Sequence, residues 1–361
     1  MRPPLAIATL GTFLTLSYLS PAAQAATMVY VANADSREIG VLTLDESNGH
    51  LHPIERVKVT GAVFPLAFSP DHRFLYAGLR SEPYSVTTFA VNQTNGALTS
   101  LSTVPLPDNM AYISTDRTGR FLFGASYFGD KVSVNPIGQQ GFVQPRPVQV
   151  IPTRPKAHAI LVDPSNSWVF ATNLGGDIIL QYKFDAVTGM LTPNTPPFIE
   201  TAKGKGPRFF VFHPGGRFVY ATDELGNAVD TYSFNAANGT LALASSAKVA
   251  PDDVKGTPAP ADLHITPDGR FLYASERTSN TLAGYKVDVE TGALTLIGHT
   301  PTEAKPRGFA IDPRGHYLLA VGEVSNAMTS YAINQETGAL APVFHLPMGK
   351  DPNWVEIVDI P

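Results

Sequence analysis

The sequence contains no cysteine, and this absence removes several classes of site. Without thiols there is no disulfide framework, no thiolate metal site, no cysteine nucleophile and no iron–sulfur cluster. Charge is also scarce, because only 16% of the 361 residues are charged, against roughly 25% in typical soluble chains. The 26 basic and 31 acidic residues give a formal net charge of -5, so no basic excess points to a nucleic-acid partner.

Long apolar runs are missing after the first 25 residues, and that first stretch has the pattern of an export signal. Arg2 provides a positive start, the stretch from Leu5 to Leu19 carries no charge, and Ala23-Gln24-Ala25 fits a small-x-small cleavage site. We therefore expect residues 1–25 to be a signal peptide, the mature chain to be periplasmic, and no membrane span to remain after cleavage. The alternative is an uncleaved N-terminal anchor.

What the chain does contain is a repeat, rich in Gly and Pro (30 and 31 residues). Its first signature is an apolar strand, a turn of Pro, Asp and Gly, and a second strand, with copies at 66–79, 112–126, 160–173, 210–223, 263–276 and 309–322. Its second signature, Asp/Asn-x-x-x-Gly-x-Leu, is typical of a hairpin turn. The glycines of that turn are Gly49, Gly96, Gly189, Gly239, Gly292 and Gly338. The missing copy falls near residues 138–141.

These two signatures predict four strands in each repeat. The turn residues Pro70, Asp116, Pro164, Pro214, Pro267 and Pro313 recur at intervals of 46, 48, 50, 53 and 46 residues, the spacing of β-propeller blades. The strand at Met28 lacks an inner partner and the strand at Trp354 lacks an outer one. We expect residues 26–361 to form an all-β, seven-bladed propeller, closed by these two strands sharing one blade. The alternative is an eight-stranded sandwich or barrel.

The repeats also point to a site. Equivalent positions in the copies have the same structural role, so the fold does not dictate the residue type where these positions differ sharply in polarity. Six residues before each turn residue stand Phe64, Met110, His158, Arg208, Ala261, Arg307 and, in the split blade, Asn353. Six residues after the residue that opens each second strand stand Ala34, Arg80, Tyr127, Leu174, Glu224, Arg277 and Glu323. Since antiparallel neighbours place both positions at one end of the sheet, both sets should line one mouth of the central channel.

Around that mouth, three consecutive blades contribute His158, Arg208, Glu224 and Arg277. An imidazole, a carboxylate and two guanidiniums are groups that can move a proton and stabilise an anion. The alternative is a solvated mouth whose Arg and Glu side chains pair without any function. A propeller that serves only as an exported binding scaffold also remains open.

Segments 156–164, 205–214, 220–225, 262–280 and 301–313 resemble the seven-bladed lactonase family, which includes propeller-type 6-phosphogluconolactonases of bacteria and the fungal carboxymuconate cyclase. The resemblance covers the whole mature chain, and its Gly-Pro-Arg, Asp-x-His-Ile-Thr-Pro-Asp-Gly-Arg and Pro-Arg-Gly-Phe motifs are specific only in combination. It places the family's site residues on His158, Arg208, Glu224 and Arg277. Where some members have a second histidine, this chain has Lys156.

The resemblance implies hydrolysis of a small-molecule sugar δ-lactone. His158 would act as base or acid, Glu224 would orient it or serve as the base, and Arg208 and Arg277 would stabilise the oxyanion. Arg307 and Asp262 are candidates for contacts to sugar hydroxyls, although Asp262 also fits a hydrogen-bonded strand residue. The export signal favours glucono-1,5-lactone, with 6-phosphogluconolactone second and muconate-type lactone formation a distant third.

Neither a cofactor nor a metal is expected. The remaining histidines are scattered without metal-ligand spacing to acidic residues, and His213 and His264 read as core or channel residues. Phosphate-loop, GxSxG and HExxH patterns are absent. The composition leaves the oligomeric state open.

Overall fold

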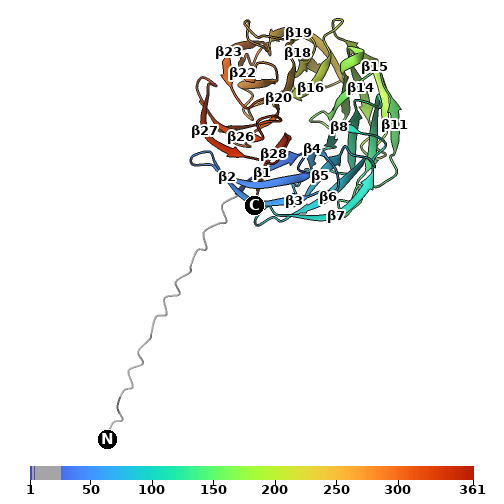
Figure 1. Ribbon diagram of the computed structural model, residues 1–361. Helices are drawn as coiled ribbons and strands as arrows, with labels where there is room; N and C mark the ends of the chain where they lie inside the picture. Colours follow the sequence, from blue (N-terminus) through green and yellow to red (C-terminus); the bar gives the residue numbers. More distant parts are fainter. Residues whose placement is uncertain (2–3, 5–25) are drawn as a thin grey trace.

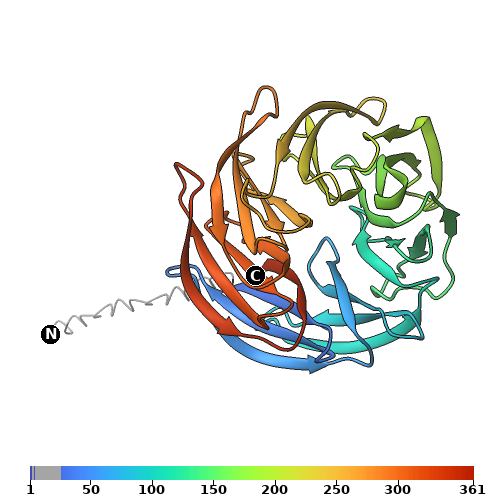
Figure 2. The ribbon, with the colours of Figure 1, turned by 45° about the horizontal axis from the view of Figure 1, so that its top comes forward.

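Seven sheets, each of four antiparallel strands, stand side by side in a ring (Figures 1 and 2). This computed structural model describes residues 1, 4 and 26–361, so the expected signal peptide lies outside the described residues apart from two positions. Within the described part the one helix is a short 3-10 turn, η1 (Leu174–Gly176), and no helix there is long and apolar enough to cross a membrane. The predicted seven-bladed propeller is confirmed, and the sandwich or barrel alternative is excluded.

The strands of the first four blades are given from the channel outward. Blade 1 is β4 (Val63–Phe68), β5 (Phe74–Leu79), β6 (Ser85–Val91) and β7 (Leu98–Pro105). Blade 2 is β8 (Met110–Thr115), β9 (Phe121–Ser126), β10 (Lys131–Pro136) and β11 (Gln149–Pro152). Blade 3 is β12 (Ala157–Val162), β13 (Trp168–Asn173), β14 (Ile178–Phe184) and β15 (Leu191–Glu200). Blade 4 is β16 (Pro207–Phe212), β17 (Phe218–Asp223), β18 (Ala228–Asn235) and β19 (Thr240–Lys248).

The last three blades follow the same order. Blade 5 is β20 (Pro260–Ile265), β21 (Phe271–Glu276), β22 (Thr281–Val287) and β23 (Leu294–Pro301). Blade 6 is β24 (Pro306–Ile311), β25 (Tyr317–Gly322), β26 (Ala327–Ile333) and β27 (Leu340–Pro347). Blade 7 is β28 (Pro352–Ile360), β1 (Ala26–Asn33), β2 (Glu38–Asp45) and β3 (His50–Lys58).

Blade 7 closes the ring with strands from the two ends of the described chain. β28 pairs antiparallel with β1, from Ala26 opposite Ile360 to Asn33 opposite Pro352, and the two lie together in Figure 1. The Thr27 hydroxyl also donates to Asp359 Oδ1 at 2.6 Å. The prediction that the two terminal strands share one blade is therefore confirmed. Such closure removes the open sheet edges that an incomplete ring would expose.

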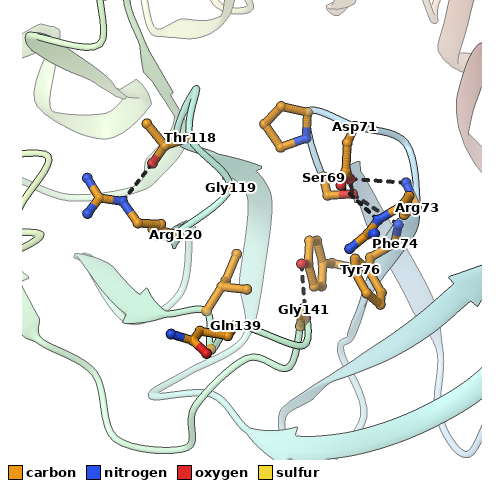
Figure 3. A pocket seen from close by; sticks show the side chains of 13 residues that line it. Ser69, Asp71, Arg73, Phe74, Tyr76, Thr118, Gly119, Arg120, Gln139 and Gly141 are labelled. Atoms are coloured by element: carbon orange, nitrogen blue, oxygen red, sulfur yellow. Dashed lines mark hydrogen bonds and ion pairs between the residues drawn. The ribbon is translucent and has the colours of Figure 1, made fainter.

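Adjacent blades interlock where a hairpin glycine of one blade meets the residue that opens the second strand of the blade before it. Gly141 has a φ of 79°, and a Cβ there would come within 2.5 Å of the Phe74 ring. The Tyr76 hydroxyl donates to the Gly141 carbonyl at 3.0 Å (Figure 3). Gly141 thus takes the place of the missing hairpin glycine, as predicted, although blade 2 has an irregular segment here with a lone bridge between Ile137 and Val143.

Burial is highest in the second strands and lowest in the outermost strands, as in blade 4. The second strand of most blades is buried along its whole length, as in β9, β17, β21 and β25, because neighbouring blades cover both of its faces. The outermost strands, such as β7, are mostly exposed or half-buried beyond their first residue. Three rings, Tyr112, Phe209 and Trp354, meet edge to face in the channel with centroids 5.1–5.7 Å apart. These rings fill the channel beneath the mouth on which the candidate residues lie.

Candidate functional site

A pocket of about 170 Å³ lies at one mouth of the channel, where the innermost strands begin and the second strands end. Its lining consists of Arg80, Ala111, Tyr127, Phe128, His158, Arg208, Glu224, Arg277 and Arg307. The structure therefore brings together all four residues predicted from blades 3 to 5, and Arg307 with them. Every polar member comes from one of the two sets of repeat positions defined on the sequence.

The backbone explains why these positions face the pocket. The register of each innermost strand shifts at the site position, so that His158 in β12, Arg208 in β16 and Arg307 in β24 fall in β-bulges without a ladder partner. A bulge bends the strand and re-aims its side chain. The residue after the second strand lies at the same end of the blade. In blade 4, the Glu224 N–H donates to the carbonyl of Gly206, directly before the innermost strand, at 2.9 Å.

One repeat position needs a correction. The residue of blade 2 that lines the pocket is Ala111, not Met110, and the bulge of β8 falls between Met110 and Tyr112. Asp116 accepts hydrogen bonds from the backbone N–H groups of its own turn, as Asp163 does in blade 3. Asp116 is therefore the counterpart of Asp163 rather than of Pro164, and the expected position in blade 2 was one residue too early.

Glu224 lies between two guanidiniums. Its Oε2 is 2.7 Å from Arg208 Nε and 3.1 Å from Arg277 Nη2. Burial alone would raise the pKa of Glu224, but Arg208 and Arg277 outweigh it and hold that pKa below its usual value. The carboxylate is therefore ionised at neutral pH and fixes the positions of both cations.

Arg208 has no exposed surface, which is unusual for this residue type. Its guanidinium stacks on Phe209, with Cζ 4.5 Å from the ring centroid. Burial, with Arg307 and Arg277 nearby, lowers the pKa of Arg208 to about 9. Among the described residues, none of its three nitrogens has an acceptor in hydrogen-bond alignment, even though Nε is close to Glu224. A buried donor fork without aligned partners can bind an oxyanion in the pocket.

His158 is buried between two aromatic rings. Tyr127 and Phe209 meet it edge to face, with centroids 5.6 and 5.1 Å away. Burial lowers the pKa of His158 well below 6.5, and the cations of Arg208, Arg307, Arg277 and Arg80 lower it further. The imidazole is therefore neutral at pH 7 and free to accept a proton.

The carboxylate does not orient this histidine. Glu224 pairs with the guanidiniums, and within the described part of the chain Nδ1 of His158 has no hydrogen-bond partner. In place of the expected orienting contact from Glu224, aromatic rings pack against the imidazole and Glu224 pairs with the two guanidiniums.

Two further guanidiniums flank one ring. Arg80 and Arg307 place their Cζ atoms 4.5 and 4.6 Å from the centroid of Phe64. Burial and Arg307 lower the pKa of Arg80 to about 10. Arg307 lies 3.6 Å from Glu323, and Arg80 donates to Asn109 at 2.5 Å. Arg80 occupies one of the repeat positions named in the sequence analysis, but it was not among the predicted site residues. Its blade, blade 1, is separated by blade 2 from blade 3, which carries His158.

Asp262 does not reach this pocket. It lies in the channel, where Oδ2 accepts from the Phe309 N–H at 3.2 Å and lies 3.4 Å from His264 Nε2. A small cavity of about 50 Å³ there is also lined by Glu356 and the three channel rings. This placement matches the hydrogen-bonded strand residue rather than a sugar contact. His264 is a channel residue, as expected, whereas His213 is buried at the opposite face, where it contacts the Gly269 carbonyl at 3.1 Å.

One group of residues with metal-ligand chemistry gathers on that opposite face. Ligand atoms of Glu46, Asp312 and His316 lie within 4.8 Å of one another. Arg314 Nη1 stands 3.8 Å from Glu46, and both Asp312 oxygens accept backbone N–H groups of their turn. Asp312 thus stabilises its own turn, and the group lies on the face opposite the mouth pocket.

Together the pocket offers a neutral imidazole that can take a proton and guanidiniums that can stabilise a developing negative charge. Those are the requirements for adding water to an ester carbonyl. The set comes from three consecutive blades: His158 from blade 3, Arg208 and Glu224 from blade 4, and Arg277 from blade 5. The comparison of equivalent positions across the repeat and the family resemblance both led to these four residues.

Comparison with known proteins gives a consistent result. Residues 26–357 match the family model described as lactonase, 7-bladed beta-propeller. A 6-phosphogluconolactonase of Pectobacterium carotovorum is 40% identical over 282 residues, covering 78% of this chain and 83% of that protein. A 6-phosphogluconolactonase of Yersinia pseudotuberculosis is 40% identical over 281 residues, with the same coverage.

Among solved structures, the periplasmic gluconolactonase of Pseudomonas aeruginosa superposes with a TM-score of 0.87. It is 26% identical, and the alignment covers 93% of this chain and all of that one. The relatives thus include enzymes named for a phosphorylated and for an unphosphorylated lactone.

Proposed function

The chain belongs to the seven-bladed β-propeller lactonase family, and from that premise we propose that it hydrolyses a sugar δ-lactone in the mouth pocket. The observation that carries the proposal is the juxtaposition of His158, Glu224, Arg208 and Arg277 in one partly enclosed cavity. A scaffold that only binds partners would have no use for a buried guanidinium without aligned acceptors beside a neutral imidazole.

In the proposed mechanism His158 removes a proton from water as the water oxygen attacks the lactone carbonyl. The carbonyl oxygen becomes an oxyanion, which Arg208 and Arg277 stabilise with their N–H donors. When the intermediate collapses, the ester bond to the ring oxygen breaks, and His158 returns its proton to that oxygen. The product is an open-chain hydroxy acid whose carboxylate can pair with the same guanidiniums.

Glu224 has a supporting role in this scheme. Its Oε2 atom lies close to both guanidiniums, and the negative charge limits the repulsion between the two cations. Its lowered pKa makes it a weak base, which favours His158 as the proton acceptor. Arg307 is proposed to contact the distal part of the sugar, since it lines the same pocket. No metal or cofactor enters any step.

For the substrate we propose glucono-1,5-lactone, opened to gluconate in the periplasm. The support is the export-signal pattern of residues 1–25, which we propose to be a cleaved signal peptide, together with the fold shared with a periplasmic gluconolactonase. Phosphorylated sugars belong mainly to the cytosol, so an exported enzyme meets the unphosphorylated lactone.

The second candidate substrate is 6-phosphogluconolactone. Four guanidiniums line the pocket against one lining carboxylate, and such an excess of positive charge suits a phosphorylated substrate. The 40% identical relatives carry the name of that activity.

The deciding experiment is acid release in a pH-stat by the mature protein, with each lactone in turn and spontaneous hydrolysis subtracted. Faster opening of the unphosphorylated lactone, lost in His158→Ala, supports the proposal. Reaction with the phosphorylated lactone alone would move the assignment to the second candidate. No rate above background with either lactone would favour the scaffold.

A further inference from the structure

A set of buried hydroxyls occurs only in the blades that carry the proposed catalytic residues. The fifth residue of the second strand is Thr172 in blade 3, Thr222 in blade 4 and Ser275 in blade 5, each without exposed surface. In blades 1, 2 and 6 the same position is occupied by Gly78, Ala125 and Val321. In blade 7, where Met28 aligns with the first residue of the other second strands, it is occupied by Ala32. Since four blades of the same ring fold without a hydroxyl there, the fold does not dictate this choice.

Each hydroxyl bonds the backbone at the bulge of its own blade. The Ala159 N–H, directly after His158, donates to Thr172 Oγ1 at 3.1 Å. The Phe209 N–H, directly after Arg208, donates to Thr222 Oγ1 at 3.2 Å. The Asp262 N–H donates to Ser275 Oγ at 3.0 Å. Phe209 and Asp262 fall in the bulges and have no ladder partner, and a buried unpaired donor would cost about 1–3 kcal/mol.

Two of the hydroxyls also cross to the next blade. Thr172 Oγ1 donates to the carbonyl of Arg208. Thr222 Oγ1 lies 3.3 Å from the carbonyl of Ala261, with the Phe209 carbonyl of its own blade at the same distance. The Arg208 carbonyl and the Phe209 N–H belong to a single peptide group, and so do the Ala261 carbonyl and the Asp262 N–H.

Thr222 has a single hydroxyl hydrogen, and when it is donated to the Ala261 carbonyl the bonds form a continuous chain with one direction. It runs from the Ala159 N–H through Thr172 to the peptide group after Arg208, then through Thr222 to the peptide group after Ala261, and ends at Ser275. Hydrogen bonds arranged head to tail polarise and strengthen one another. The chain ends beside the segment that holds Arg277, whose Nε donates to the Ala259 carbonyl at 3.0 Å.

We infer that Thr172 and Thr222 are positioning residues, which set the spacing of His158, Arg208 and Arg277 across two blade boundaries. The inference rests on the proposed function for its kinetic readout, but the bonded chain can be tested without turnover. Blades are otherwise separate sheets, and small shifts between neighbours would change the distance from imidazole to guanidinium directly. A displacement of about 1 Å between reacting groups can cost on the order of 100-fold in rate.

The test compares Thr172→Val, Thr172→Ser and Thr88→Val in the mature protein. Valine keeps the shape and removes the hydroxyl, whereas serine restores it. Thr88 is the matched control, because it is buried without exposed surface and its hydroxyl has no partner among the described residues. We expect Thr172→Val to lower kcat by about 10- to 100-fold with a smaller change in KM. Thr172→Ser and Thr88→Val should stay within about twofold of the parent in kcat, since neither breaks the chain.

Amide hydrogen exchange of segments 157–162 and 207–212 gives the readout that does not depend on turnover. Thr172→Val should accelerate exchange in both segments, because the chain couples them, and Thr88→Val should accelerate neither. Thr222→Val, the second variant, should accelerate exchange in 207–212.

An unchanged kcat and unchanged exchange in Thr172→Val would overturn the inference. An inactive parent protein would instead refute the proposed function, and the exchange data alone would then decide whether the chain exists. Equal losses in Thr172→Val and Thr172→Ser would also contradict it, because they would tie the effect to bulk rather than to the hydroxyl.

Discussion

Blades 4 and 6 place the same two residue types at the same two repeat positions, yet the pairs differ. In blade 4, Arg208 is fully buried and lies 2.7 Å from Glu224. In blade 6, Arg307 lies 3.6 Å from Glu323, and the second cation on that carboxylate is Lys305, whose side chain is 53% exposed. Glu224 lines the pocket and Glu323 does not.

An Arg–Glu pair at a propeller mouth is therefore not by itself a functional site. What sets blade 4 apart is that blade 3 beside it carries His158 and that Arg277 of blade 5 pairs with Glu224 at 3.1 Å. The blade 6 pair adjoins Asn353 of blade 7, which is buried and donates to the Asp351 carbonyl at 2.9 Å. Matched substitutions in blades 4 and 6 test this difference.

The largest difference is expected for the two arginines. Arg208→Lys keeps a charge but loses the planar fork, so kcat should fall by about 10²–10³. Arg307→Lys should act mainly through KM and lower kcat by less than about tenfold, since it is proposed to contact the distal sugar. Steady-state kinetics on one lactone measures both, and similar losses of kcat in the two variants would remove the distinction between the blades.

A second difference is expected in stability, at the lysines behind each pair. Lys205 Nζ lies 3.1 Å from Asp223 and 2.7 Å from Asp230, both buried, and burial with the nearby Asp230 raises the pKa of Asp223 to about 8. Lys205→Met would leave two buried carboxyls without a cation. The free energy of unfolding should fall by about 2–3 kcal/mol, less than a fixed buried pair would lose because Asp223 can protonate.

Lys305→Met is the control for that measurement. The Lys305 side chain is 53% exposed, so the expected change is within about 1 kcal/mol. Urea unfolding followed by tryptophan fluorescence compares the two variants directly. A larger loss in Lys305→Met than in Lys205→Met would contradict the assignment of the buried network to blade 4.

The smallest expected effect is in the titration of His158. Its pKa is lowered by burial and then by Arg208 more than by Arg307. The neutral base therefore persists below pH 6.5, and the acid limb of kcat/KM should have its midpoint below that value. The same depressed pKa means that the unfolded chain binds the proton more readily, so this group's contribution to stability declines as pH falls below 6.5.

Imidazole resonances followed by NMR across pH would assign that midpoint, with His158→Ala identifying the signal. Arg208→Gln should raise the His158 midpoint more than Arg307→Gln does. A His158 midpoint at or above 6.5 in the parent protein would be inconsistent with a buried imidazole among four cations.

The sequence was sufficient for the blades and for most of the mouth, because repetition supplies its own alignment. Gly141 could be placed in the irregular hairpin of blade 2 from spacing alone. Met110 was misplaced by one residue because blade 2 has no proline in its turn, so Asp116 was aligned with the wrong partner. Asp262 stood next to a mouth position, but its side chain bonds the Phe309 N–H within the channel instead, a contact that no spacing rule conveys.

The sequence also did not predict which side chains in the pocket pair with one another. Glu224 follows a strand and could equally have faced His158 or the guanidiniums, and only the three-dimensional arrangement gives it to Arg208 and Arg277. Arg80 was visible at a ring position, yet its approach to Arg307 over Phe64 depends on the ring bringing blades 1 and 6 to opposite sides of blade 7.

The most direct test of the account is the pair Glu224→Gln and Glu323→Gln, measured for kcat/KM on the lactone that the parent protein opens fastest. Both changes are isosteric and remove one carboxylate charge from equivalent positions. The account predicts a loss of about 100-fold for Glu224→Gln, which releases the two guanidiniums that stabilise the oxyanion, and less than about fivefold for Glu323→Gln. Equal losses, or a larger loss in Glu323→Gln, would contradict the placement of the chemistry in blades 3 to 5.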